Sequence, residues 1–231
     1  VPTGGGGLAS GISIWMNDEF PECEVIPVQH RSSSSLNEAL ESGGPENVEP
    51  PDTMAEGIAT GRIGDRTYSV LEKYSRSPLL VGDDQIIESI LWLLEHEKIL
   101  AEGAGAAGIS ALHQFPGQLP DGPGCVIVSG GNLDIMETIH FLERGMRTRG
   151  QLIRLEAELP DRPGALSDLS GIIGDYGGNI QFIHHDRTDR TVAARSARVQ
   201  VEISLADKEA RKEMLKKLKD RGYNPRSLDD K

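Results

Sequence analysis

The chain has 231 residues, 37% of them hydrophobic, which is enough to bury the core of one large domain or of an ordinary domain plus a small one. Its 24 basic and 36 acidic residues give a net charge of −12, which argues against nucleic acid and anionic membrane surfaces as partners. No apolar run approaches the ~20 residues that a bilayer requires, and the N-terminus lacks a signal-peptide pattern, so the sequence predicts a soluble, cytoplasmic protein.

The first motif is a run of four glycines from Gly4 to Gly7, followed by Leu8 and a stretch that can form a helix from Ala9 to Met16. Consecutive glycines let the backbone turn its N–H groups inward, and the start of a helix adds positive potential. The pattern predicts a phosphate-binding loop, with a flexible linker or a strained turn as the alternative. A nucleoside-triphosphate loop would need Lys and then Ser or Thr where Leu8 and Ala9 stand.

The same glycines also resemble a dinucleotide fingerprint, since Gly4, Gly6 and Ala9 satisfy its spacing. That fingerprint requires an acidic residue at the end of the next strand, where it binds the ribose hydroxyls. The next predicted strand, residues 24–28, is followed by Gln29 and His30. The dinucleotide interpretation is therefore weak.

Residues 1–149 alternate short apolar runs with helices, which is typical of a parallel sheet covered on both faces. Residues 24–28 are one predicted strand, and residues 125–128 are a better one because they form a continuous apolar run. Between them, we expect Asp83 to cap a helix whose buried stripe is Ile86, Ile87, Ile90, Leu91 and Leu94. Residues 42–52, rich in Gly, Pro and acidic residues, are a predicted loop.

Ser129 follows the predicted strand 125–128 and precedes Gly130 and Gly131. A Ser at the carboxyl end of a central parallel strand lies where open α/β sheets bind ligands. It is not a nucleophile elbow, because Ile127 stands where that motif requires its first glycine. The alternative is that Ser129 caps the next helix, although Asp134 is the better cap.

The stretch from Glu102 to Gly108 consists of small residues behind one carboxylate, which most often indicates tight helix packing. Two cysteines, Cys23 and Cys125, cannot build a disulfide framework or a metal cage. His184 and His185 are adjacent on a predicted strand and point to opposite faces, so they do not share a metal. We expect structural or solvent-facing roles for all six histidines and no metal site.

The charge balance changes near Gly150: residues 1–149 hold 9 basic and 22 acidic residues, a net of −13, whereas residues 151–231 hold 15 and 14, a net of +1. A predicted helix from Ile135 to about Arg147 ends just before this point. The second part reads as β-α-β-β-α with a short terminal strand near Tyr223, the split βαβ, ferredoxin-like arrangement. We therefore predict two domains, residues 1–149 and residues 150–231.

Four motifs taken together resemble threonine ammonia-lyase (threonine dehydratase), a fold type II pyridoxal-phosphate enzyme. They are residues 1–8 (VPTGGGGL), 55–59 (AEGIA), 101–106 (AEGAGA) and 128–134 (VSGGNLD). Residues 159–166 (LPDRPGAL), followed by residues 177–180 (GGNI), resemble an ACT domain, a ferredoxin-like module that binds amino acids. The resemblance implies an open parallel α/β sheet, like that of the tryptophan synthase β chain but partial, followed by an α+β ACT domain.

The resemblance implies a site for pyridoxal 5'-phosphate. Its phosphate would lie on the loop formed by Gly4, Gly5, Gly6, Gly7 and Leu8. Ser129 would hydrogen-bond the pyridine nitrogen, and Glu102 would lie near the ring. A neutral hydroxyl does not hold that nitrogen protonated, which suits β-elimination. The implied reaction converts threonine, or serine, to a 2-oxo acid and ammonia, as in isoleucine biosynthesis.

For the second domain the resemblance implies an effector amino acid, often bound across a subunit interface. The implied contacts are Asp161, Pro163, Gly164, Ala165, Leu166, Asn179 and Ile180. Gly164 lies at a helix start, where backbone N–H groups can bind a carboxylate. Single ACT units usually pair, so we expect a homo-oligomer, a dimer or a tetramer.

The family's Schiff-base lysine lies in sequence that would precede Val1. No lysine occurs before Lys73, and neither Lys73 nor Lys98 lies in a motif that could replace it. We therefore expect the chain to be a C-terminal portion that needs the N-terminal part for activity and contributes no catalytic residue of its own. Serine racemase relatives place acidic metal ligands where Gln29 and Ser35 stand here, which argues against a divalent cation. Two alternatives stay open: a non-catalytic amino-acid-sensing ACT protein and, less favoured, a dinucleotide enzyme.

Overall fold

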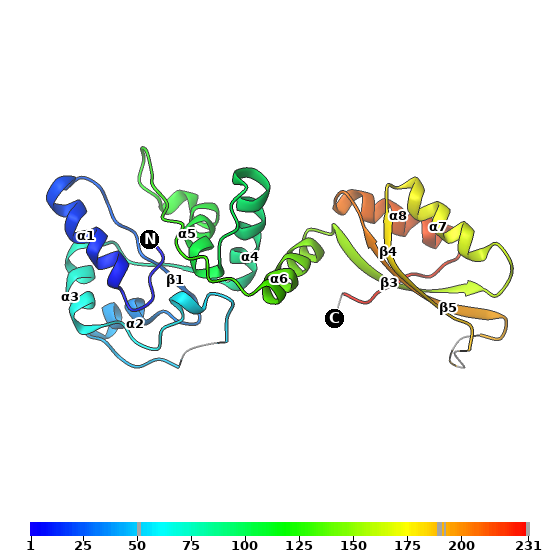
Figure 1. The fold of residues 1–231 in the computed structure, drawn as a ribbon, viewed down its shortest axis with the longest axis horizontal. Coiled ribbons are helices and arrows are strands. Elements are labelled where there is room, and N and C mark those ends of the chain that lie inside the picture. Colours follow the sequence, from blue (N-terminus) through cyan, green and yellow to red (C-terminus); the bar gives the residue numbers. More distant parts are fainter. Residues whose placement is uncertain (50–51, 189–190, 192, 230–231) are drawn as a thin grey trace. The chain divides into compact units, whose positions relative to one another are not determined.

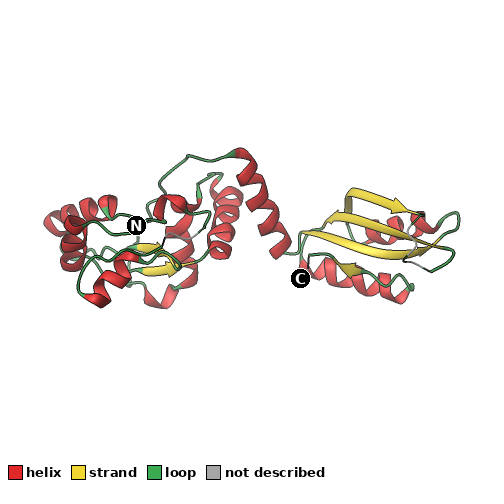
Figure 2. Ribbon diagram, turned by 90° about the horizontal axis from the view of Figure 1, so that it is seen from below, coloured by secondary structure: helices red, strands yellow, loops and turns green. Residues whose placement is uncertain are grey.

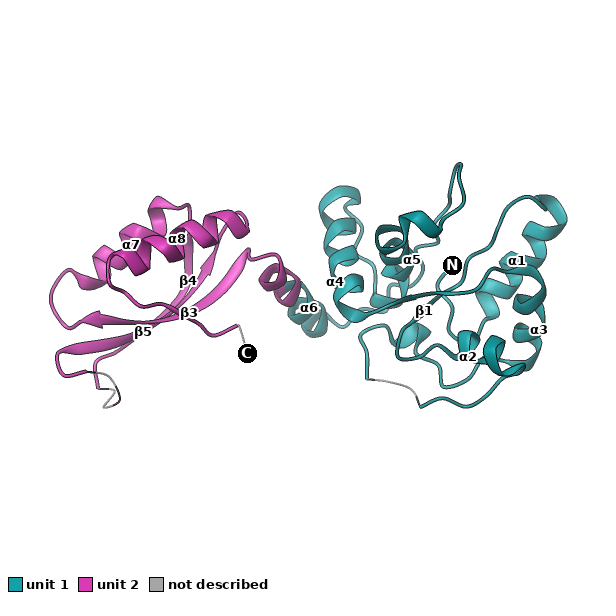
Figure 3. Ribbon diagram, turned by 180° about the vertical axis from the view of Figure 1, so that it is seen from behind, with its two compact units in different colours: residues 1–142 teal, residues 143–231 magenta. Residues whose placement is uncertain are grey.

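The computed structural model describes residues 1–49, 52–188, 191 and 193–229. They form two compact units, Val1–Leu142 and Glu143–Lys231 (Figure 3). Helix α6 (Ile135–Thr148) crosses the division, which falls at residue 142 and not at the change of charge near Gly150. None of the helices in the described ranges is long and apolar enough to cross a membrane.

The first unit consists of helices around a small parallel sheet (Figure 1). Strands β1 and β2 pair in parallel from Val28↔Leu79 to His30↔Val81, and Pro2 forms a further parallel bridge to Val28. The elements before α6 are α1 (Gly7–Glu19), β1 (Val28–His30), α2 (Ser35–Ser42), η1 (Glu56–Ile58), α3 (Asp65–Tyr74), β2 (Leu79–Val81), α4 (Asp83–Trp92), η2 (Leu93–Glu97), α5 (Gly103–Gln114) and η3 (Pro116–Gln118).

Helix α4 confirms most of the predicted apolar stripe, since Ile86, Ile87, Ile90 and Leu91 are buried. Leu94 is an exception: it lies beyond the end of α4, in η2, and is half-buried. The expected cap is wrong, because Gly82 is the N-cap residue and its N–H donates to Gln85 Oε1 at 3.2 Å. The Asp83 carboxylate instead accepts a hydrogen bond from Thr53 Oγ1 at 2.5 Å. Helix α1 also begins earlier than predicted, at Gly7. Of the predicted loop 42–52, Ser42 ends α2, 43–49 and 52 lie outside helices and strands, and 50–51 lie outside the described residues.

Both strands predicted in the first unit need correction. The strand expected at 24–28 is observed at Val28–His30, because Pro27 has no N–H to give to a ladder. The run 125–128 forms no strand, and Cys125 and Val128 are exposed. This segment packs against the glycines of α5 and not into the sheet: a Cβ on Gly105 would overlap the Ser129 carbonyl, and one on Gly108 would lie 2.6 Å from Val126 Cγ1. Tight packing of the small residues is thus confirmed.

The second unit is a four-stranded antiparallel sheet in the order β4-β5-β3-β6, with two helices on one face (Figures 1 and 2). The predicted ferredoxin-like arrangement is confirmed. Alternate side chains of β3 and β5 are buried with apolar residues of both helices. The elements are β3 (Leu152–Pro160), α7 (Ala165–Asp175), β4 (Asn179–Asp186), β5 (Ser196–Ser204), α8 (Lys208–Asp220) and β6 (Arg226–Ser227).

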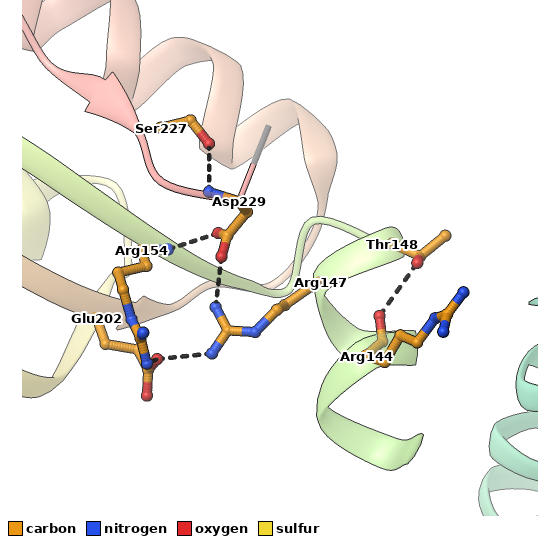
Figure 4. A network of polar contacts seen from close by, with 7 residues as sticks. All are labelled: Arg144, Arg147, Thr148, Arg154, Glu202, Ser227 and Asp229. Carbon is orange, nitrogen blue, oxygen red and sulfur yellow. Dashed lines mark hydrogen bonds and ion pairs between the residues drawn. The ribbon is translucent and has the colours of Figure 1, made fainter. Parts of the chain in front are cut away.

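The last turn of α6 is fastened to the polar face of this sheet by an ionic network (Figure 4). The Arg147 guanidinium donates to Glu202 Oε2 at 2.6 Å and to Asp229 Oδ1 at 2.8 Å. Arg154 donates from its side chain to Glu202 and from its backbone to Asp229. The hydrogen bond from Arg147 is the main reason that the pKa of Glu202 lies below its ordinary value.

Candidate functional site

Two of the sequence motifs meet in one cavity of the first unit. The cavity has a volume of about 330 Å³, within the range of small-molecule sites. The glycine loop forms one part of its wall and the 129–130 segment another, although more than 100 residues separate them in sequence. Its lining residues are Pro2, Thr3, Gly4, Gly5, Gly6, Gly7, Leu8, Ala9, Gly57, Ile58, Glu102, Ala104, Ser129 and Gly130.

The four glycines of the loop serve two purposes. A Cβ on Gly4 would lie 2.9 Å from the Gly57 carbonyl oxygen, and one on Gly6 would lie 2.7 Å from Ile63 Cδ1. Gly6 also has a φ of 87°, which disfavours any residue with a side chain. Gly5 and Gly7, in contrast, face open space, because a Cβ on either would meet no atom within 4 Å. The fold itself therefore requires Gly4 and Gly6, whereas Gly5 and Gly7 leave room beside the backbone.

The N–H groups of this loop are available to a ligand. The first backbone hydrogen bond of α1 runs from Ser10 N to Gly6 O at 2.8 Å. Within the described ranges, the N–H groups of Gly5, Gly6, Gly7 and Leu8 donate to no protein acceptor. Free N–H groups at a helix start attract anions, and a phosphate most of all. The predicted helix-and-loop geometry is thus present at the cavity.

Ser129 forms another part of the cavity wall and does not cap helix α6. Asp134 caps that helix, since its Oδ1 accepts from Glu137 N at 3.0 Å. The half-buried Ser129 hydroxyl has no hydrogen-bond partner in the part of the chain that the structure describes. It can therefore donate to, or accept from, a ligand in the cavity.

Glu102 stands beside Ser129, where it holds the following turn. Its Oε2 accepts a hydrogen bond from the Asn132 N–H at 2.9 Å. Gly130, with a φ of 86°, leaves the space that the carboxylate fills, because a Cβ there would overlap Glu102. Glu102 also lines a neighbouring cavity of about 350 Å³, together with Glu56, Asp134 and Glu137. No three or more His, Cys, Asp or Glu side chains are arranged to hold a metal ion in the described ranges.

Sequence reasoning missed the residues that lie behind the glycine loop. Thr67, on helix α3, donates through Oγ1 to the Gly5 carbonyl at 2.7 Å, and Gly64 N donates to the same oxygen at 3.4 Å. The spacing of 62 residues between Thr67 and Gly5 leaves no local signal for such a contact. From sequence alone, a hydroxyl residue near the start of a helix indicates only that a helix begins there.

Residues 1–130 match the family model described as pyridoxal-phosphate dependent enzyme, and residues 153–222 match the ACT domain. The chain belongs to the pyridoxal-phosphate dependent enzyme family. It is 35% identical to an L-threonine ammonia-lyase of Thermotoga maritima over 98% of this chain and 56% of that protein. A protein of the same name from Geobacter sulfurreducens is 32% identical over 96% of this chain and 56% of that protein. The chain spans about half the length of these curated relatives.

Comparison with solved structures shows that this chain has part of the type II fold of pyridoxal-phosphate dependent enzymes. The processed form of threonine deaminase isoform 2 from Solanum lycopersicum superposes with a TM-score of 0.57. The two sequences are 25% identical, and the match covers 62% of this chain and 40% of the threonine deaminase chain. The expected fold, part of a type II α/β domain followed by an ACT domain, is confirmed.

The cavity fits the cofactor of this family. Free backbone N–H groups at the glycine loop match a phosphate, and the unpaired Ser129 hydroxyl matches a pyridine nitrogen. The open space beside Gly5 and Gly7 leaves room for the phosphate oxygens. Of the residues that the structure describes, no lysine lines the cavity.

His30 is buried near the end of β1 but does not line the cavity. Its Nδ1 accepts from Ser32 N, and its Nε2 lies 3.5 Å from Asp83 Oδ1. Burial lowers the pKa of His30 below its ordinary value, although the nearby Asp83 carboxylate opposes this shift. Both cysteines, Cys23 and Cys125, are free and exposed.

One copy of the second unit does not bring the expected effector residues together. Asp161, Pro163, Gly164, Ala165 and Leu166 lie at the start of helix α7, whereas Asn179 and Ile180 follow its end. The helix has 11 residues and is about 16 Å long, so the two groups lie near its opposite ends. Gly164 has a φ of 90° and open space beside it, and the Asp161 carboxylate is paired with Arg187.

Proposed function

We propose that this chain carries the cofactor-binding part of a cytoplasmic threonine ammonia-lyase, which converts L-threonine to 2-oxobutanoate and ammonia, and an amino-acid-binding ACT domain. The observation that carries the proposal is the single cavity lined by both the glycine loop and Ser129. Relatives named L-threonine ammonia-lyase, which align over nearly all of the chain, support the choice of reaction.

In this proposal the backbone N–H groups of Gly5 to Leu8 bind the cofactor phosphate. Ser129 orients the ring through a hydrogen bond to its nitrogen, and the neutral hydroxyl leaves that nitrogen without a full positive charge. Pyridoxal phosphate, when bound, supplies the electron sink for β-elimination of water from the substrate. Glu102 fixes the 129–132 turn through the Asn132 N–H and lies near the ring.

The amine that forms the Schiff base is, in this proposal, not one of the lysines of residues 1–231. The first of them, Lys73, is on α3, and neither it nor Lys98 lines the cavity. The reaction requires such an amine, so residues 1–231 by themselves should bind the cofactor without converting threonine. Supplied with a lysine-bearing N-terminal part, the protein should release 2-oxobutanoate.

The experiment is a binding titration with pyridoxamine 5'-phosphate, which carries its own amine and needs no protein lysine. Calorimetry should detect binding to the chain, and Gly5→Ala and Gly7→Ala should weaken it more than tenfold because their methyl groups enter the phosphate space. Gly11→Ala is the matched control, since this glycine also has open space beside it but does not line the cavity.

Absence of pyridoxamine 5'-phosphate binding to the unchanged chain would contradict the proposed cofactor site. Binding without 2-oxobutanoate production, even after addition of the lysine-bearing part, would favour the alternative of a non-catalytic amino-acid sensor. Affinity for NAD in place of pyridoxamine 5'-phosphate would favour a dinucleotide enzyme.

We further propose that the effector site forms between two copies of the second unit. The two groups of implied effector residues lie at opposite ends of α7, so a second copy is needed to unite them. Strand β4 lies at the edge of the sheet and exposes Phe182 (57%) and Ile183 (38%). Sedimentation should show a dimer or a tetramer, and isoleucine, valine or threonine should bind it. A monomer that binds one of these amino acids would contradict a shared site.

A further inference from the structure

Thr67 contacts the glycine loop and the helix that follows it at once. Its Oγ1 lies 2.7 Å from the Gly5 carbonyl oxygen and 2.9 Å from the Gly64 carbonyl oxygen, and its single proton is donated mainly to the nearer one, that of Gly5. Its own carbonyl accepts from Ser10 Oγ at 3.2 Å. Its side chain also packs directly against Gly6, where a Cβ would lie 2.8 Å from Thr67 Oγ1. One residue of α3 therefore binds both the loop and α1, because it donates a hydrogen bond to Gly5 and accepts one from Ser10.

The direction of the Gly5 carbonyl determines that of the next N–H. The peptide unit is planar and trans, so its C=O and N–H point in opposite directions. The Gly5 carbonyl points to Thr67 and Gly64, which lie behind the loop because neither lines the cavity. The Gly6 N–H consequently points away from α3, to the cavity side of the loop.

A loop of four glycines has no side chains to hold this direction. Glycine has more backbone freedom than any other residue, so an unsupported loop would populate other carbonyl orientations. The support has to come from neighbouring residues, and the hydroxyl of Thr67 makes the shortest hydrogen bond to the loop.

We propose that Thr67 is a positioning residue for phosphate binding: its hydroxyl ties the Gly5 carbonyl to helix α3 and thereby holds the Gly6 N–H towards the phosphate. Thr67 does not touch the ligand. The inference deepens the proposed function and rests on it, because it names the residue that preorganises the phosphate-binding loop.

The test compares three variants of the full chain. Thr67→Val removes the hydroxyl and keeps the shape of the side chain. Thr67→Ser keeps the hydroxyl and removes the methyl group. Ser69→Ala is the matched control, because Ser69 donates to the Asp65 carbonyl on the same helix and has no contact with the loop. The probes are inorganic phosphate, pyridoxamine 5'-phosphate and unphosphorylated pyridoxamine, titrated by calorimetry. Hydrogen exchange of the Gly6 to Leu8 amides is measured without ligand.

Thr67→Val should weaken binding of both phosphate-bearing probes about three- to tenfold, the value of one lost hydrogen bond. It should leave pyridoxamine binding unchanged and speed exchange of the Gly6 to Leu8 amides. Thr67→Ser should bind within about twofold of the unchanged chain. Ser69→Ala should match the unchanged chain in both measurements.

Thr67→Val with unchanged phosphate affinity and unchanged exchange would overturn the inference. Equal weakening by Thr67→Val and Thr67→Ser would overturn it too, since the hydroxyl would then not be the cause. If the unchanged chain binds none of the probes, the proposed function fails. Faster exchange in Thr67→Val with unchanged phosphate affinity would overturn it as well, because the hydroxyl would then hold the loop without affecting phosphate binding.

Discussion

In the second unit, side chains alternate between core and solvent along β3 and β5, and nine residues of one strand pair with nine of the other. In the first unit, strands β1 and β2 have three residues each, and several glycines beside the cavity lie where no Cβ would fit. A Cβ on Gly105 would overlap the Ser129 carbonyl, and one on Gly57 would lie 2.9 Å from Ala104 Cβ.

The difference shows two ways of building a core. The second unit relies on buried side chains, which stabilise in proportion to the apolar area that they remove from water. The first unit also buries apolar side chains, among them Leu36, Ile86 and Ile90, but it additionally brings backbone segments close together at glycines beside the cavity. The glycines beside the cavity should therefore be sensitive to added methyl groups, and the buried side chains of the second unit to removed ones.

The largest effect is expected from Ile203→Ala, which removes a fully buried side chain from β5. The cavity that it leaves should lower the free energy of unfolding of the second unit by about 2–5 kcal/mol. Lys216→Ala, at an exposed position of α8, is the control and should change it by less than about 0.5 kcal/mol. Circular dichroism in urea measures both, and equal losses would break the comparison.

Gly105→Ala should destabilise the first unit by about 1–3 kcal/mol, because the new methyl group would overlap the Ser129 carbonyl. Gly171→Ala on α7 adds the same methyl group where it meets no atom within 4 Å, and should stabilise the second unit by about 0.5–1 kcal/mol. Both tryptophans, Trp15 and Trp92, are in the first unit, so their fluorescence measures the effect of Gly105→Ala, and circular dichroism in urea measures that of Gly171→Ala. A tolerated Gly105→Ala would show that the 129 segment is not held by this contact.

Glu202→Gln should cost the second unit about 1–2 kcal/mol at pH 7, since it breaks charged hydrogen bonds to Arg147 and Arg154. The pKa of Glu202 is lowered in the folded protein, so this stabilisation is present above the ordinary value of 4.5 and is lost as the pH falls below it. The free energy of unfolding of the variant should therefore change less between pH 5 and pH 3 than that of the unchanged chain. Glu158→Gln, at an exposed position of β3, is the control and should keep the slope.

The smallest effect is expected at His30, whose pKa is lowered by burial. Because the unfolded chain binds the proton more readily, the first unit should lose stability as the pH falls below about 6.5. His30→Gln should remove this part of the pH dependence, whereas His140→Gln, at an exposed position, should not. Tryptophan fluorescence during unfolding at pH 7.5 and 5.5 measures the difference. An unchanged slope in His30→Gln would contradict the assignment.

Prediction from sequence was best where the pattern is local and repeated. The β-α-β-β-α order of the second part was enough to predict the ferredoxin-like unit, in which β3 and β5 alternate buried and exposed side chains. Prediction from sequence failed at residues 125–128. Their apolar run suggested a buried strand, but the segment forms no strand and packs against the glycines of α5. It failed at Asp83 as well, because Thr53 binds the carboxylate that was expected to cap the helix.

The sequence by itself determined the glycine loop, the helix behind it and the alternating strands of the second unit, because each depends on residues close together in the chain. The tertiary structure decided that Ser129 lies across one cavity from that loop, that Thr67 supports the loop from behind, and that the two groups of effector residues lie apart. These are contacts between residues distant in sequence. No local periodicity encodes them, since they depend on how close the packed backbones can approach.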